Sequence, residues 1–317
     1  MAQTTSTDGG PYHVPVMVRE VVELFAPAAD GLVVDATFGG GGHALALLAT
    51  YPGLRVLGLD RDPDAVAHAP EQPRLRVLTA NFGRLGETLA DELGPYRDHG
   101  GAVEGVLLDL GVSSHQLDTP TRGFSYQHAG PLDMRMGPDA ELAAGDAVNE
   151  WDAADLERAF RRFGEERYAR RIADSIVRSR PIADTAELAA VIAAAVPAPA
   201  RRARHPARRV FQALRIAVNA ELESLAAGLD EAIAWLRPGG RLVVIAYHSL
   251  EDRIVKRRLL AGAGGCVCPP DLPVCGCDNP GELKIVTRRP LRPTSDEVDA
   301  NPRARSARLR AATKAAA

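Results

Sequence analysis

The stretch LVVDATFGGGGH, residues 32–43, decides the fold of this chain. LVVDA predicts a buried strand, because a short apolar, β-branched run that ends at a turn signal is typical of one. Four glycines follow, and they let the backbone turn tightly and come close to a ligand. The next residues, ALALLA, have a helical pattern. Strand, glycine turn and helix in this order predict the ligand-binding edge of an α/β sheet.

Further apolar runs occur on both sides of a long central segment. They are RVLGLD (55–60), RLRVLTA (74–80), VEGVLLDL (103–110), RLVVIAY (241–247) and ELKIVTRR (282–289). The first three alternate with helical patterns, and the strands are apolar on both faces. Both features predict an α/β fold with a parallel sheet that helices cover on each side.

The central segment has a helical pattern and contains no predicted strand from about residue 140 to 196. We therefore expect an all-helical insert in a two-part sheet domain. The expected bounds are 1–120 and 207–317 for the sheet domain and 121–206 for the insert.

Two expectations concern the last third of the chain. We expect one long helix from about Pro206 to Leu236, because apolar residues recur at helical spacing until Pro238 and two glycines end the pattern. The tail from Asn301 is polar and rich in arginine, and we expect it to fray.

Composition limits the function classes. The chain has 317 residues, 46% of them hydrophobic, and a formal net charge of −3, so a nucleic-acid partner would need positive charge gathered locally. The N-terminal residues do not resemble a signal peptide and no apolar run could span a bilayer, so we expect a cytoplasmic protein without a membrane partner. The oligomeric state, a homodimer included, is left open.

The four cysteines, Cys266, Cys268, Cys275 and Cys277, form C-x-C-x6-C-x-C in a Pro/Gly-rich segment. In a cytoplasmic protein they are thiols or metal ligands rather than disulfides. Four thiols this close suit structural zinc, but the pairs are spaced more tightly than in common zinc sites. We assign no metal, and leave zinc open.

Two cofactor classes fit the glycine turn. Gly39, Gly41 and Ala44 satisfy the relaxed dinucleotide fingerprint, and Asp60 ends the second strand where an acid can bind ribose hydroxyls. Asp35, just before the glycines, favours S-adenosylmethionine instead, because a carboxylate suits the methionine ammonium and would repel a pyrophosphate. A nicotinamide-dependent oxidoreductase therefore remains the alternative enzyme class.

Longer strings along the chain resemble one family, that of ribosomal RNA small subunit methyltransferase H. The strings include DATFGGGGH, GLDRDPDA, LLDLGVSSHQLD, GPLDMRM, GEERYARRIA, FQALRIAVNAEL and HSLEDRIVK. The resemblance covers about Tyr12 to Arg310. It implies a class I Rossmann-like methyltransferase sheet with a helical insert, and methyl transfer from S-adenosylmethionine to N4 of a cytidine in 16S ribosomal RNA, at the decoding centre of the small subunit. A non-catalytic assembly factor that keeps the fold is the further alternative.

The resemblance also implies the cofactor-binding residues. They are Gly41, Gly42, His43, Asp60, Phe82, Asp109 and Gln116. Phe82 is equally well explained by core packing. Asp109 is also the candidate catalytic residue, from its position after the fourth strand. The residues after it, Leu110-Gly111-Val112, lack the prolines and aromatic of many amino-methyltransferases, so their mechanism cannot be transferred.

Candidate RNA contacts are positively charged or aromatic. Arginines crowd residues 201–209 and mark the tail at 303–310, where they either bind phosphate or form a solvated face. In the helical pattern at 152–180, acids largely offset the arginines. Phe124, Tyr126 and the loop at 130–136 could line a pocket for the base. Ser249 and the acids after it predict either helix capping or a group at the cofactor edge.

Overall fold

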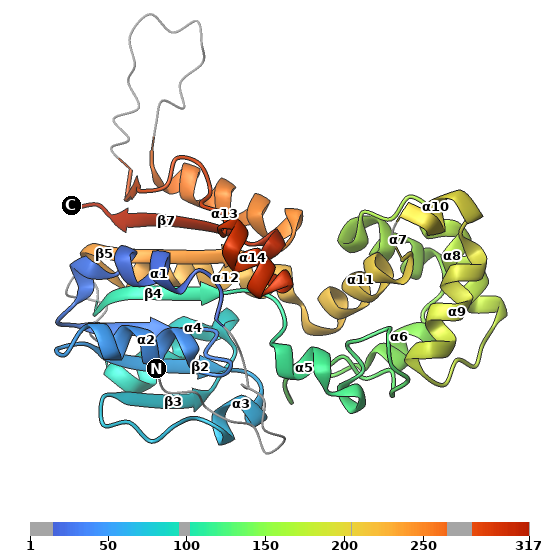
Figure 1. Cartoon of the computed structure of the whole chain (residues 1–317), viewed down its shortest axis with the longest axis horizontal. Helices are drawn as coiled ribbons and strands as arrows, with labels where there is room; N and C mark the ends of the chain where they lie inside the picture. Colours follow the sequence, from blue (N-terminus) through green and yellow to red (C-terminus); the bar gives the residue numbers. More distant parts are fainter. Residues whose placement is uncertain (1–14, 95–101, 204, 265–280, 317) are drawn as a thin grey trace, which may run out of the picture. The chain divides into compact units, whose positions relative to one another are not determined.

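The structure is a computed structural model that describes residues 15–94, 102–203, 205–264 and 281–316. The chain divides into two compact units (Figure 1). The sheet unit comprises Met1–Gly111 and Leu222–Ala317, and the helical unit comprises Val112–Glu221. The four cysteines lie outside the described residues, so zinc binding stays open. Among the described residues, no helix is long and apolar enough to cross a bilayer.

The sheet unit contains seven strands in the order β3-β2-β1-β4-β5-β7-β6. Their bounds are β1 Leu32–Asp35, β2 Arg55–Asp60, β3 Leu75–Thr79, β4 Val103–Asp109, β5 Leu236–Ala246, β6 Leu283–Ile285 and β7 Arg308–Lys314. The first five pair in parallel, and β7 is antiparallel to both neighbours. The predicted α/β, Rossmann-like sheet is confirmed.

Helices cover both faces of this sheet. They are α1 Val18–Leu24, α2 Gly42–Thr50, α3 Pro63–Ala67, α4 Leu85–Leu93, α12 Glu221–Trp235, α13 Ser249–Gly262 and α14 Ser295–Ala300. Val33 and Leu107 pack into one core with α1 and α2, whereas Val34 and Leu108 pack into another with α4, α12 and α13. Successive residues of a strand point to opposite faces, so strands between two helix layers must be apolar throughout.

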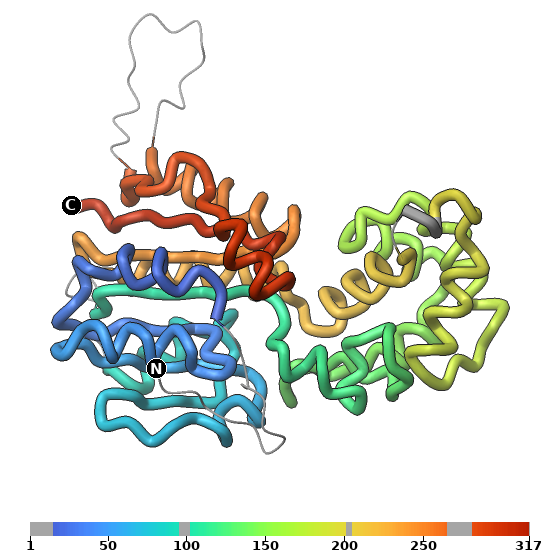
Figure 2. Tube along the Cα trace, in the orientation of Figure 1, coloured from blue at the N-terminus to red at the C-terminus, as the bar shows by residue number. Residues whose placement is uncertain are grey.

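The C-terminal tail is strand β7, and the expectation that it frays is wrong. Figure 2 shows it running beside β5, with which it pairs from Arg308 to Thr313. Arg310 Nε donates to Asp252 Oδ1 at 2.7 Å, and Arg308 Nη1 donates to Asp252 Oδ2 at 3.0 Å. Asp252 on α13 therefore neutralises two arginines of this strand, while Leu309, Ala311 and Ala312 enter the cores.

We expect Asp252→Ala to lower the free energy of unfolding by about 3 kcal/mol, because it leaves the buried Arg310 without its anionic partner. Chemical denaturation of the purified protein measures this. Asp299→Ala, which removes an exposed carboxylate from α14, is the matched control and should change stability little. Equal stabilities of the two variants would show that the ion pair does not hold the strand in place.

The helical unit is built from seven α-helices in its described part. They are α5 Ser114–Asp118, α6 Ala144–Glu150, α7 Ala153–Gly164, α8 Ala169–Arg178, α9 Thr185–Ala195, α10 Ala198–Ala203 and α11 Ala207–Asn219. One apolar cluster joins them, and it includes Phe160, Ile172, Ile192 and Leu214. The all-helical character of the insert is confirmed, although the unit begins and ends at different residues than we expected.

The boundary after the helical unit differs because the expected long helix is broken. Helix α11 ends at Asn219, and Ala220 adopts a left-handed conformation with φ +46° before α12 begins. Asn219 is buried: its Oδ1 accepts from Met136 N–H at 2.8 Å and its Nδ2 donates to the Met134 carbonyl at 2.7 Å. These bonds fix the end of α11 to the loop at 130–136, so α11 belongs to the helical unit.

The same loop is partly buried, and the base pocket that we expected there stays a prediction. Leu132, Met134 and Met136 are core residues of the helical unit, and so is Phe124. Tyr126 stacks on His205 with 4.7 Å between ring centroids. The loop and its neighbouring aromatics therefore stabilise the helical unit.

Candidate active site

Three acidic residues end neighbouring strands of the sheet. Asp35 ends β1, Asp60 ends β2 and Asp109 ends β4. The strands are parallel and β1 lies between the other two, so the three residues share the carboxyl edge of the sheet. The strand order reverses at β1, and ligands of open α/β sheets bind at such switch points. The structure thus brings together the acids that the sequence singled out.

The glycine turn after β1 is shaped for close approach. Gly39 and Gly41 have φ of +53° and +72°, which side chains rarely allow. A Cβ at Gly41 would lie 2.6 Å from the Phe38 ring, whereas at Gly39 the nearest atom is 3.9 Å away. The Asp60 side chain stabilises the turn, because its Oδ2 accepts from Gly39 N–H at 2.7 Å. The turn therefore has room for a ligand beside Gly39 and an acid within reach.

Asp109 is held by the buried His43 and the half-buried Tyr247. The Tyr247 hydroxyl donates to Asp109 Oδ1 at 2.8 Å, and His43 Nε2 lies 3.3 Å from Asp109 Oδ2. The backbone N–H of Asp109 donates to Thr37 Oγ1 at 2.6 Å. The carboxylate is thereby fixed in one orientation at the edge of the sheet, which is what a residue that contacts a reacting group requires.

These contacts shift the pKa values of Tyr247 and His43, the two side chains that hold Asp109. Burial raises the pKa of the Tyr247 phenol well above its ordinary value, and the Asp109 charge raises it further. Burial lowers the pKa of the His43 imidazole, but the bond and charge of Asp109 raise it by more, so the net shift is upward. Tyr247 thus remains a hydrogen-bond donor at neutral pH. Sequence reasoning missed it, because only the β4–β5 pairing places it beside Asp109.

Asp35 carries an unsatisfied buried oxygen. The residue is 1% exposed, and its Oδ2 has no hydrogen-bond partner in the described part of the chain. Burial raises the pKa of Asp35 to about 7, and burial likewise raises the pKa of Asp60 to about 6. A buried carboxylate with one unpartnered oxygen suits a cationic ligand, whose charge would stabilise it. This site therefore fits the ammonium and sulfonium groups of S-adenosylmethionine.

We expect Asp35→Asn to stabilise the ligand-free protein increasingly as the pH rises. The pKa of Asp35 is about 7 in the folded state, above its ordinary value of 3.8. Between these values the folded protein keeps a proton that the unfolded chain has lost, so wild-type stability falls as pH rises through this window. Asparagine does not ionise. Denaturation from about pH 5 to about pH 8 should show a growing stability difference in favour of the variant; a constant difference would contradict the buried charge.

Two other predicted cofactor residues, Phe82 and Gln116, have packing or capping contacts within the protein. Phe82 follows β3, is half-buried and packs closely against Gly228 of α12, where an added Cβ would lie 2.8 Å from Phe82 Cδ2. Gln116 belongs to the helical unit, where its Oε1 accepts from Ser113 N–H at 3.0 Å and its own N–H donates to Ser113 Oγ at 3.1 Å. These contacts form a capping box at the start of α5. Cofactor contacts by both residues stay predictions.

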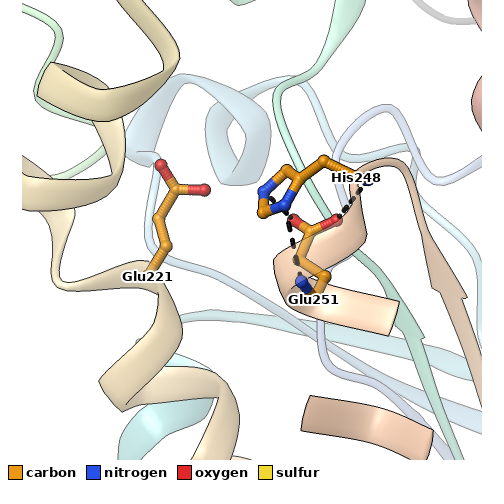
Figure 3. A group of neighbouring side chains, drawn as sticks. All are labelled: Glu221, His248 and Glu251. Atoms are coloured by element: carbon orange, nitrogen blue, oxygen red, sulfur yellow. Dashed lines mark hydrogen bonds and ion pairs between the residues drawn. The ribbon is translucent and has the colours of Figure 1, made fainter. Parts of the chain in front are cut away.

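The segment after β5 begins helix α13. His248, rather than the expected Ser249, is the N-cap. Glu251 Oε2 accepts from Tyr247 N–H at 2.8 Å and from His248 N–H at 3.2 Å, and Figure 3 shows the Glu251 carboxylate beside the His248 ring. The segment does cap a helix, but through His248, and the acids Glu251 and Asp252 are buried rather than solvated. Because Glu251 accepts from Tyr247 N–H, it also helps to hold the tyrosine that contacts Asp109.

Comparison with known proteins identifies the family. The sequence model of the MraW methylase family matches residues 11–315. The chain belongs to this family. It is 49% identical to ribosomal RNA small subunit methyltransferase H of Heliobacterium modesticaldum, over 96% of this chain and 98% of the relative. It is 50% identical to the protein of the same name from Symbiobacterium thermophilum, over 96% of each chain.

Family membership decides between the enzyme classes that the glycine turn left open. The chain is a methyltransferase that uses S-adenosylmethionine, and the nicotinamide-dependent alternative is wrong. The resemblance stated from the sequence strings is confirmed over nearly the full chain.

Proposed function

We propose that this protein transfers the methyl group of S-adenosylmethionine to the exocyclic N4 amine of a cytidine in 16S ribosomal RNA, at the decoding centre. The observation that carries the chemistry is the fixed Asp109 carboxylate at the switch point, beside the glycine turn. The RNA substrate is supported by relatives about half identical over their full length, which are named as small-subunit RNA methyltransferases.

The cofactor positions follow from the contacts at the sheet edge. Asp35 would accept a bond from the methionine ammonium, because its buried Oδ2 has no partner in the described ranges. Asp60 would accept from the ribose hydroxyls while it keeps its bond to Gly39. Gly41 is the N-cap of α2 and Gly42 and His43 are its first residues, so these three would lie next to the ligand, and Phe82 would contact the adenine. Gln116 completes the proposed set.

The substrate amine is a poor nucleophile, since its lone pair is delocalised into the cytosine ring. S-adenosylmethionine supplies an activated methyl group on a sulfonium. A bond forms between the amine nitrogen and the methyl carbon as the carbon–sulfur bond breaks, and the nitrogen must then lose a proton. We assign to the Asp109 carboxylate the orientation of this amine and the acceptance of its proton. Tyr247 and His43 keep the carboxylate oriented.

The proposed partner is 16S ribosomal RNA, either free or within the small subunit, and the proposed location is the cytoplasm, where subunits are assembled. To test the partner, the protein is incubated with methyl-labelled S-adenosylmethionine and either naked 16S RNA or small subunits from cells that lack this activity. We expect label in the RNA of at least one substrate. Cofactor binding without transfer to either would contradict the proposal and favour the assembly-factor alternative.

A further inference from the structure

A hollow on the surface of the helical unit is lined almost entirely by arginines. Its lining residues are Arg167, Tyr168, Arg170, Arg171, Asp174 and Arg178, from α8 and the turn before it. All four arginines are exposed, and Asp174 is the one acid among the lining residues. We call Arg167, Arg170, Arg171 and Arg178 the α8 arginine surface.

The acids that balance these arginines in the sequence are engaged elsewhere. Glu157 pairs with Arg161 at 2.8 Å on α7. Glu166 is 7% exposed, accepts from Tyr168 N–H at 2.8 Å and lies 3.9 Å from Arg209. Glu157 and Glu166 therefore do not offset the exposed arginines of this segment, whereas Asp174 lies among them.

The arginines of α8 itself have no such partners. Within the described residues, Arg170, Arg171 and Arg178 have no ion-pair partner. Arg167 instead lies over the Tyr168 ring, with 5.6 Å from its guanidinium carbon to the ring centroid. The hollow thus combines unneutralised guanidinium groups with a half-buried aromatic ring.

We infer that the α8 arginine surface binds the phosphodiester backbone of the RNA substrate, an inference that rests on the proposed function. Guanidinium groups bind phosphate oxygens in pairs of hydrogen bonds. Arg171 and Arg178 are seven residues apart on one helix, which places them about 10 Å apart along its axis, far enough to contact separate phosphates. Clustered exposed arginines are the electrostatic footprint of a nucleic-acid-binding surface.

Three of the arginines expected from sequence to contact RNA have partners within the protein. Arg209 Nη1 donates to the Glu165 carbonyl at 3.2 Å and lies beside Glu166. In the tail, Arg308 and Arg310 pair with Asp252. These three arginines are therefore less available to phosphate than those of the α8 arginine surface.

The test is a triple variant, Arg170→Gln, Arg171→Gln and Arg178→Gln, in the full chain. Binding to a fluorescently labelled 16S RNA fragment is measured by anisotropy over a range of salt concentrations. We expect affinity at low salt to fall at least tenfold and the slope of log K against log salt to decrease by about 2. The lysine triple variant should keep most of the slope, since it keeps the charge. Thermal unfolding verifies that each variant is folded.

The matched control is Arg158→Gln with Arg161→Gln, which removes two arginines of α7 that pair with Asp155 and Glu157. We expect it to leave the salt slope nearly unchanged. An unchanged slope in the triple variant, or an equal loss in the control, would overturn the inference. Failure of the proposed function would appear differently, as a wild-type protein that neither binds nor methylates the RNA. Affinity for S-adenosylmethionine should be equal in all variants, which separates RNA binding from loss of the cofactor site.

Discussion

Asp109→Asn is expected to lower methyl transfer at saturating cofactor and RNA by at least about 100-fold. Asparagine keeps the size of the side chain and can still accept the Tyr247 hydroxyl, which donates to Asp109 Oδ1 at 2.8 Å. It cannot accept a proton or attract the His43 imidazole, whose Nε2 lies 3.3 Å from Oδ2. Single-turnover methylation, with cofactor affinity measured by calorimetry, separates the chemical step from binding.

Tyr247→Phe is the companion variant for Asp109. It removes one hydrogen bond to the carboxylate and leaves the carboxylate in place, so we expect a smaller loss, about tenfold. If Asp109→Asn turns over normally, Asp109 has no role in the chemical step. If the Asp109→Asn variant loses cofactor affinity in proportion to turnover, Asp109 orients the methionine end of the cofactor instead of the amine.

Asp60→Ala is expected to weaken S-adenosylmethionine binding by about 100-fold or more, since hydrogen bonds to a charged group contribute about 1.5–3 kcal/mol each. The substitution removes the proposed acceptor for the ribose hydroxyls. It also removes the bond from Gly39 N–H to Oδ2, at 2.7 Å, that holds the glycine turn. Calorimetric titration with S-adenosylmethionine measures the loss.

Asp64→Ala is the matched control for Asp60. This exposed carboxylate lies in the first turn of α3, only four residues along the chain. It should change cofactor affinity by less than about threefold, because a surface charge is screened by solvent and salt. Equal affinities of the Asp60 and Asp64 variants would mean that Asp60 does not contact the cofactor.

The parallel sheet and the glycine turn could be predicted from sequence because their signals are local. The strand that ends at Asp35 is a continuous apolar run, and positive φ at Gly39 and Gly41 requires the residue that stands there. Asp60 and Asp109 followed from the rule that parallel strands end at one edge. These features need no knowledge of distant contacts.

Other features depend on contacts between residues far apart in sequence. The tail becomes a strand because Asp252 neutralises Arg308 and Arg310, 56 and 58 residues away. Ala220 breaks the expected long helix, and alanine gives no signal of a left-handed conformation. Tyr247 reaches Asp109 only through the pairing of β4 with β5. Such contacts are set by packing, which local patterns do not encode.

The most direct test of the account identifies the methylated atom. RNA labelled by the wild-type protein from methyl-labelled S-adenosylmethionine is digested to nucleosides, which are separated and identified by mass and fragmentation. The account predicts the label in N4-methylated cytidine derived from 16S ribosomal RNA, and about 100-fold less of it with Asp109→Asn. Label in another nucleoside, or on another atom of cytidine, would contradict it.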